Sequence, residues 1–123
     1  VTRQVKSHLA ANGITPKHYV LVEPRFSRAG VYGVQEYFNC PSVSELYNYF
    51  EKEYSPTKDE AAICRQFMGR NHGFTQELLD SAYGELTRHR GQAGTLHNSI
   101  RFSNIIVLGV TKGRALRLAI VDY

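Results

Sequence analysis

The residues of this sequence that most resemble an enzyme site form one short segment, Arg70-Asn71-His72, with a glycine on each side. A histidine beside an arginine and an asparagine can act as a general base next to a phosphate clamp, as in a metal-independent ribonuclease. A single loop histidine is more often only exposed to solvent. We therefore assign no catalytic residue and keep a small ribonuclease-like enzyme centred on His72 as a second alternative.

The remaining histidines and the cysteines predict no metal site and no cofactor. Two cysteines, Cys40 and Cys64, are too few for a zinc site made of cysteines alone, and we expect both to be buried free thiols. No glycine-rich phosphate loop, nucleophile elbow or paired-carboxylate motif occurs. The other histidines show no metal-ligand spacing among themselves: His8, His18, His89 and His97.

Charge is distributed unevenly along the chain. From Leu86 onward there are six basic residues and one acid, whereas residues 41–62 hold five acids and two lysines. Such a separation favours a protein that presents one face to a polyanion. Each lysine or arginine on a phosphate backbone displaces a counterion. We expect a nucleic-acid partner, DNA or RNA, contacted by five residues: Arg88, Arg90, Lys112, Arg114 and Arg117.

The same basic residues also have a purely structural interpretation. Arg88 and Arg90 would suit the negative end of a helix dipole, and basic side chains on a hairpin guard a sheet edge against pairing with other chains. Arg117 is the most informative of the five because it interrupts an apolar strand. Its side chain must reach either solvent or an acid.

The first part of the chain predicts a helix and a hairpin. Val5 and Leu9 are four residues apart in a helix that ends at Asn12-Gly13. Two strands, at residues 18–22 and 31–38, are separated by a loop and form a hairpin.

Three helices are predicted next. Ser42 to Glu45 and Thr57 to Glu60 both have the capping-box pattern, which marks the start of a helix. Thr75 caps the third helix, whose apolar stripe is Leu78, Leu79, Ala82 and Leu86 and which stops at residues 91–94. The exposed face of that helix is expected to carry Gln76, Glu77, Asp80 and Glu85.

The chain ends in a predicted apolar hairpin, residues 99–123. One face is expected to hold Ile100, Phe102, Ile106, Leu108 and Val110 together with Leu116, Leu118 and Ile120, and the other Ile105, Val107, Ala119 and Val121. A strand pair that is apolar on both faces must be covered on both. We therefore expect this hairpin to be central in the fold or buried in a homodimer.

Three helices followed by a hairpin resemble, in their order, the winged-helix DNA-binding class over roughly residues 42–123. The resemblance implies that residues 75–90 form the recognition helix and that Lys112 to Arg114 form the tip of the wing. Carboxylates on the exposed face of such a helix would repel phosphate.

The sequence thus predicts one α+β domain over residues 1–123, with antiparallel hairpins flanking a three-helix segment. It is 42% hydrophobic and 21% charged, with a formal net charge of +4, and it has no apolar run long enough to cross a membrane. We expect a small, basic, cytoplasmic nucleic-acid-binding protein that forms a homodimer. The first alternative is a non-catalytic protein-interaction module that uses the apolar hairpin and a tyrosine-rich helix containing Tyr47, Tyr49, Phe50 and Tyr54.

Overall fold

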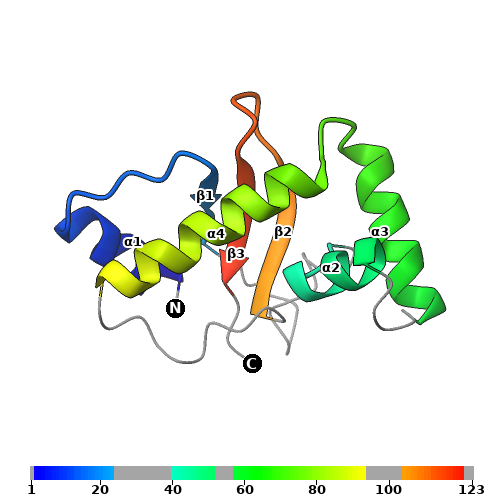
Figure 1. The fold of residues 1–123 in the computed structure, drawn as a ribbon, viewed down its shortest axis with the longest axis horizontal. Helices are drawn as coiled ribbons and strands as arrows, with labels where there is room; N and C mark the ends of the chain where they lie inside the picture. The colour runs from blue at the N-terminus through cyan, green and yellow to red at the C-terminus, as the bar shows by residue number, and fades with distance from the viewer. Residues whose placement is uncertain (1, 24–39, 52–56, 94–103, 121–123) are drawn as a thin grey trace, which may run out of the picture.

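The computed structural model describes residues 2–23, 40–51, 57–93 and 104–120, and in these it shows a mixed α+β fold (Figure 1). The predicted strand at 31–38 and the residues Ile100, Phe102 and Val121 lie outside the described residues. The elements in chain order are α1 (Thr2–Ala11), β1 (Tyr19–Leu21), α2 (Val43–Glu51), α3 (Lys58–Arg70), α4 (Gln76–Ala93), β2 (Ile105–Val110) and β3 (Leu116–Ile120).

Local capping signals place the helix starts where the sequence predicts them. The Glu45 amide donates to Ser42 Oγ at 3.1 Å, and the Leu78 amide donates to Thr75 Oγ1 at 3.2 Å. At α3 the Thr57 side chain and Glu60 form the complete reciprocal capping box. Helix α4 ends at Ala93, within the predicted stop at residues 91–94, and it includes Gly84 and Gly91. A helical glycine costs only about 1 kcal/mol relative to alanine, which tertiary contacts elsewhere on a helix can offset.

Strand β3 is the centre of the sheet, whose order is β1-β3-β2. The predicted antiparallel pairing of the last two strands is confirmed. Strand β1 is shorter than predicted and pairs parallel to β3, with Tyr19 opposite Leu116 and Leu21 opposite Leu118. This pairing joins segments almost a hundred residues apart, so no local pattern in the sequence could indicate it.

The predicted assignment of hairpin residues to faces is right for Val110 and for β3 and wrong for residues 105–108 of β2. Cross-strand partners share a face of a sheet, and Val107 lies opposite Leu118, whereas Ile106 lies opposite Ala119. The core face therefore combines Ile105 and Val107 of β2, not Ile106 and Leu108, with the leucines of β3. A register irregularity between Val107 and Gly109 then brings Gly109 opposite Arg117.

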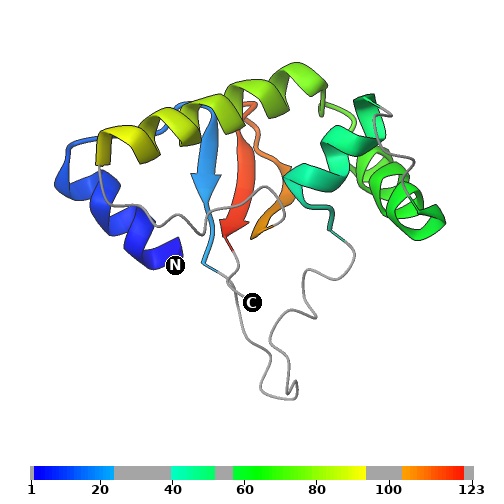
Figure 2. The ribbon, with the colours of Figure 1, turned by 60° about the horizontal axis from the view of Figure 1, so that its bottom comes forward.

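Helix α4 lies across one face of the sheet, with α1 at one end and α2 and α3 at the other (Figures 1 and 2). Its buried side chains Leu79, Ala82 and Leu86 share one core with Leu116 and Leu118 of β3. On the other face of the hairpin, Ile106 is 5% exposed and Ala119 is fully buried. The apolar residues Ile106 and Ala119 of this second face are thus buried within a single chain, as expected of a central hairpin.

Candidate functional site

The tip of the β2–β3 hairpin is an exposed basic turn. The Arg114 amide donates to the Thr111 carbonyl at 3.0 Å, and the Thr111 amide donates to the Ala115 carbonyl at 2.8 Å. These two bonds close a tight turn at whose apex Lys112 and Arg114 are exposed. Its two cations are free to meet a partner without moving the strands.

Arg114 has an unusual backbone conformation for an arginine. Its φ of 63° lies in the left-handed region, and it is the one non-glycine residue with positive φ among those the structure describes. This conformation costs roughly 1–2 kcal/mol for a residue with a Cβ atom, and glycine avoids that cost. Because the turn is exposed, core packing does not explain the arginine. A strained residue with no structural reason is an indication of a functional one.

Arg117 lies on the outer face of the sheet, away from α4. It is exposed between the buried residues Leu116 and Leu118, since successive side chains of a strand point to opposite faces. Its neighbour across the parallel pairing is Val20, which is 47% exposed. The requirement that Arg117 reach solvent or an acid is met by solvent.

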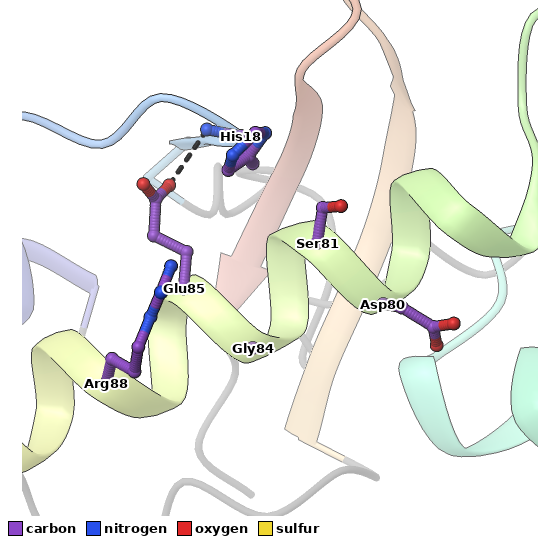
Figure 3. Close-up of a pocket in the computed structure, with 6 residues that line it drawn as sticks. All are labelled: His18, Asp80, Ser81, Gly84, Glu85 and Arg88. Atoms are coloured by element: carbon purple, nitrogen blue, oxygen red, sulfur yellow. Dashed lines mark hydrogen bonds between the residues drawn. The ribbon is translucent and has the colours of Figure 1, made fainter.

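Arg88 and Arg90 belong to α4, on the other side of the sheet from Arg117. Arg88 is exposed and lines a pocket of about 490 Å³ together with Asp80 and Glu85 (Figure 3). Glu85 is the carboxylate drawn nearer to Arg88, whereas Asp80 lies farther along α4 and accepts from the Tyr47 hydroxyl. The side chain of Arg90 lies outside the described residues. The structure therefore brings three of the five predicted residues onto the hairpin and separates Arg88 from them.

Glu85 is buried, and its predicted place on the exposed face of α4 is wrong. Its side chain is 5% exposed and accepts hydrogen bonds from the backbone amides of Lys17, at 2.9 and 3.1 Å, and His18, at 2.8 Å. These amides belong to residues just before β1. The carboxylate is the hydrogen-bond acceptor for these donors, which the strand pairing leaves without one. Glu85 follows Ala82 by three residues and Leu78 by seven, which is the spacing of the buried stripe and the signal that could have revealed it.

A second polar contact joins the same two elements. The Tyr19 hydroxyl and His89 Nδ1 are 2.7 Å apart, and the two rings lie 5.7 Å apart between centroids. Burial, and secondarily the charge of Glu85, raise the pKa of Tyr19, so the phenol stays protonated. Together with the hydrogen bonds of Glu85, the Tyr19–His89 contact holds α4 against β1. We interpret the contact as structural.

In the Arg70-Asn71-His72 segment, Arg70 ends α3, and Asn71 and His72 begin the turn to α4. His72 is exposed, and Asn71 is the residue that fixes the turn. Asn71 Nδ2 donates to the Phe67 carbonyl at 2.9 Å, while Asn71 Oδ1 accepts from the Val110 amide at 3.4 Å. Within the described ranges, no three metal-ligating side chains of histidine, cysteine, aspartate or glutamate form a group that could hold a metal ion.

The tyrosine-rich helix is α2, and it faces the core more than solvent. Tyr47, Tyr49 and Phe50 are partly buried and pack against the core, and the Tyr47 hydroxyl donates to Asp80 at 2.7 Å. Tyr54 lies outside the described residues. The cysteines are free thiols as predicted, with Cys64 buried and Cys40 only partly so.

Comparison with known proteins finds no matching family model, no matching curated protein and no matching solved structure. Of the helices in the described part of the chain, none has the length and apolar character needed to cross a membrane. Function must therefore be argued from the residues themselves.

Proposed function

We propose that this protein binds the phosphate backbone of a nucleic acid through Lys112, Arg114 and Arg117. The observation that carries the proposal is the exposed hairpin tip, where an arginine occupies a left-handed position that favours glycine. Three exposed cations follow one another within six residues, and no acid occurs in residues 104–120. Phosphate contacts of this kind position a protein on nucleic acid without reading its sequence.

The structure narrows the set of residues that support this proposal. Arg88 is a weaker candidate, because Glu85 and Asp80 line the same pocket. A winged-helix-like mode remains part of the proposal only in that the hairpin tip would take the place of the wing.

We also propose that the protein forms a homodimer. Ile106 and Ala119 are buried within one chain, so they do not need a partner chain to cover them. The support for a homodimer is therefore Val20, the large apolar side chain that is exposed among the described residues. Light scattering in the micromolar range tests this point.

The test is a double charge reversal, Lys112→Glu with Arg114→Glu. It should lower affinity for duplex DNA or single-stranded RNA by more than about tenfold near 50 mM salt, because two counterion-releasing contacts become repulsive. Folding should be unchanged, as monitored by circular dichroism. The matched control is Lys58→Glu with Arg65→Glu, which changes the net charge equally at exposed positions on α3.

Equal losses in both double variants would show that net charge alone governs binding. Binding that survives the hairpin reversal, or no binding by the parent protein, would contradict the proposal. Either result would favour the protein-interaction module instead. The ribonuclease alternative has its own test, since His72→Ala would abolish any RNA cleavage that the parent protein shows.

A second candidate function is the binding of a magnesium–nucleotide complex, and a different observation favours it. Asn104 directly precedes β2, and the first pair of the hairpin joins Ile105 to Ile120. Asp122 follows Ile120 by two residues in the sequence and lies outside the described residues. Asparagine and aspartate oxygens are ligands suited to Mg²⁺.

The sequence spacing around this pair agrees with phosphoryl-transfer chemistry. In protein kinases, an asparagine seven residues after a histidine and an aspartate after the next strands hold the metal ions of Mg-ATP. Here the corresponding residues are His97, Asn104 and Asp122, but Ser99 stands where those enzymes have the proton-accepting aspartate. The candidate function is therefore nucleotide binding, without an assigned catalytic base.

Calorimetric titration with ATP tests this second function. Binding should require Mg²⁺ and should be lost in Asp122→Asn and reduced in Asn104→Ala, while the matched variant Asp80→Asn should bind like the parent. Absence of magnesium-dependent binding by the parent protein would exclude this function and leave the nucleic-acid proposal untouched.

A further inference from the structure

We infer that the turn between α3 and α4 belongs to the same phosphate-binding surface as the hairpin tip, with His72 as its exposed member. The inference rests on the proposed nucleic-acid function and deepens it, because it names a second segment that meets the phosphate backbone. The segment is far from the hairpin in sequence, so the surface is a product of the fold. His72 is then a binding residue and not a catalytic base.

Asn71 is the link between the two segments. It ends α3, where its own amide donates to the carbonyls of Phe67 and Met68. Its side chain then accepts from the Val110 amide at the end of β2. Val110 precedes Lys112 by two residues and Asn71 precedes His72 by one. The hairpin tip and this turn extend to the same side of the molecule (Figure 1).

Gly109 allows this approach. A Cβ atom at position 109 would lie 3.1 Å from Asn71 Oδ1, which is closer than ordinary van der Waals contact. Glycine at this point in the strand therefore permits the asparagine to dock against the hairpin. The contact fixes where the turn, and with it His72, lies relative to the tip.

The charge on both segments has one sign. Residues 61–76 contain no aspartate or glutamate, and neither do residues 104–120. The first acid after the turn is Glu77, in the first turn of α4. The α4–β1 region differs, since Glu85 and Arg88 line the same pocket there. A polyanion that follows the hairpin tip onto the turn meets cationic or neutral side chains until it reaches α4.

The experiment adds a permanent charge at one of two histidines. His72→Lys places a cation on the inferred surface, and the matched variant His8→Lys places the same cation on α1, at the other end of the molecule. Binding to a duplex DNA oligonucleotide is measured at about pH 8, above the range in which imidazole ordinarily titrates. His72→Lys should raise affinity about 3- to 10-fold near 50 mM salt and steepen the salt slope by about 0.9. His8→Lys should change affinity by less than about twofold, because α1 lies at the other end of the molecule and salt screens charges that are far apart.

A second variant tests the link itself. Asn71→Ala in the His72→Lys background should remove at least half of the gain in affinity, since it deletes the side chain that joins the turn to Val110. Gly109→Ala, which shifts the Asn71 side chain by only a few tenths of an ångström, should have a smaller effect. A gain that is the same for His72→Lys and His8→Lys would overturn the inference while the hairpin proposal stands. Failure of the proposed function is a separate result, namely no effect of reversing Lys112 and Arg114.

Discussion

Two regions of this molecule use charged side chains in opposite ways. Where α4 meets β1, the carboxylate of Glu85 is buried and its oxygens accept from two backbone amides. At the hairpin tip, Lys112 and Arg114 are in solvent, and one of them holds a left-handed backbone. In the first region the charge completes the fold. In the second region the fold gains nothing from the charge.

The difference shows which charged residues are functional candidates. A buried charge requires partners, and its loss leaves them unsatisfied, so Glu85 is explained by stability alone. An exposed cation contributes little to stability, so its presence in a strained position needs another reason. This contrast predicts that variants of the two regions will affect different measurements. Stability should respond at the α4–β1 contact and in the core, and affinity at the tip.

The largest expected effect on stability is in the core that carries the hairpin. Leu118→Ala should lower the free energy of unfolding by roughly 2–5 kcal/mol, because Leu118 is 1% exposed in the central strand. Denaturant titration measures the loss. A loss below about 1 kcal/mol would mean that the hairpin is a loosely packed arm, contrary to its central place in the sheet.

Glu85→Ala should cost slightly less, about 2–4 kcal/mol, because two backbone amides lose their acceptor in a partly buried site. Affinity for nucleic acid at a temperature where the variant is folded should equal that of the parent protein. A variant as stable as the parent would show that water replaces the carboxylate easily. A large change in affinity would contradict the proposal that the α4–β1 contact serves stability and the hairpin tip serves binding.

Arg114→Gly should act in the opposite direction on the two measurements. Glycine relieves the left-handed strain, so the protein should become more stable by about 1 kcal/mol. Affinity should nevertheless fall, by about 3- to 10-fold near 50 mM salt, because one phosphate contact is lost. Lys112→Ala serves as the control that removes a charge without changing the backbone. A variant that is more stable and binds equally well would remove the functional reason for Arg114.

The smallest effect concerns the thiols, and it is a difference in reactivity. Burial raises the pKa of Cys64 to about 12, and burial also raises the pKa of Cys40. Only the thiolate reacts, so near pH 8 the native protein should react slowly with a thiol reagent, at Cys40 before Cys64. Peptide mapping of the labelled protein gives the order. Fast labelling of Cys64 in the native state would contradict its place in the core.

The sequence predicts the local parts of this structure and fails on the distant ones. Capping at Ser42, Thr57 and Thr75 depends on residues three apart, which the sequence displays directly. The parallel pairing of β1 with β3 and the burial of Glu85 depend on contacts across the whole chain, which it does not display. Residues 105–108 of β2 are assigned to the wrong faces because the strand is irregular between Val107 and Gly109, and a shift of one residue exchanges the two faces.

The same difference between local and long-range features applies to the candidate site. Lys112 and Arg114 are exposed because they lie in a turn, and a turn is a local feature that the sequence displays. Arg88 lies apart from them because of how α4 crosses the sheet, and this long-range arrangement is not displayed in the sequence. The role of Asn71 in joining the α3–α4 turn to β2 was equally hidden, because its partner Val110 is 39 residues away.

The most direct test of the central claim is the salt dependence of binding by the parent protein. If Lys112, Arg114 and Arg117 meet phosphates, the logarithm of the association constant should fall linearly with the logarithm of salt concentration. The slope should be about −2 to −3, since each contact contributes roughly −0.7 to −0.9. The double reversal of Lys112 and Arg114 should flatten it to near −1. A slope near zero, or the same slope in parent and variant, would contradict phosphate binding by the hairpin.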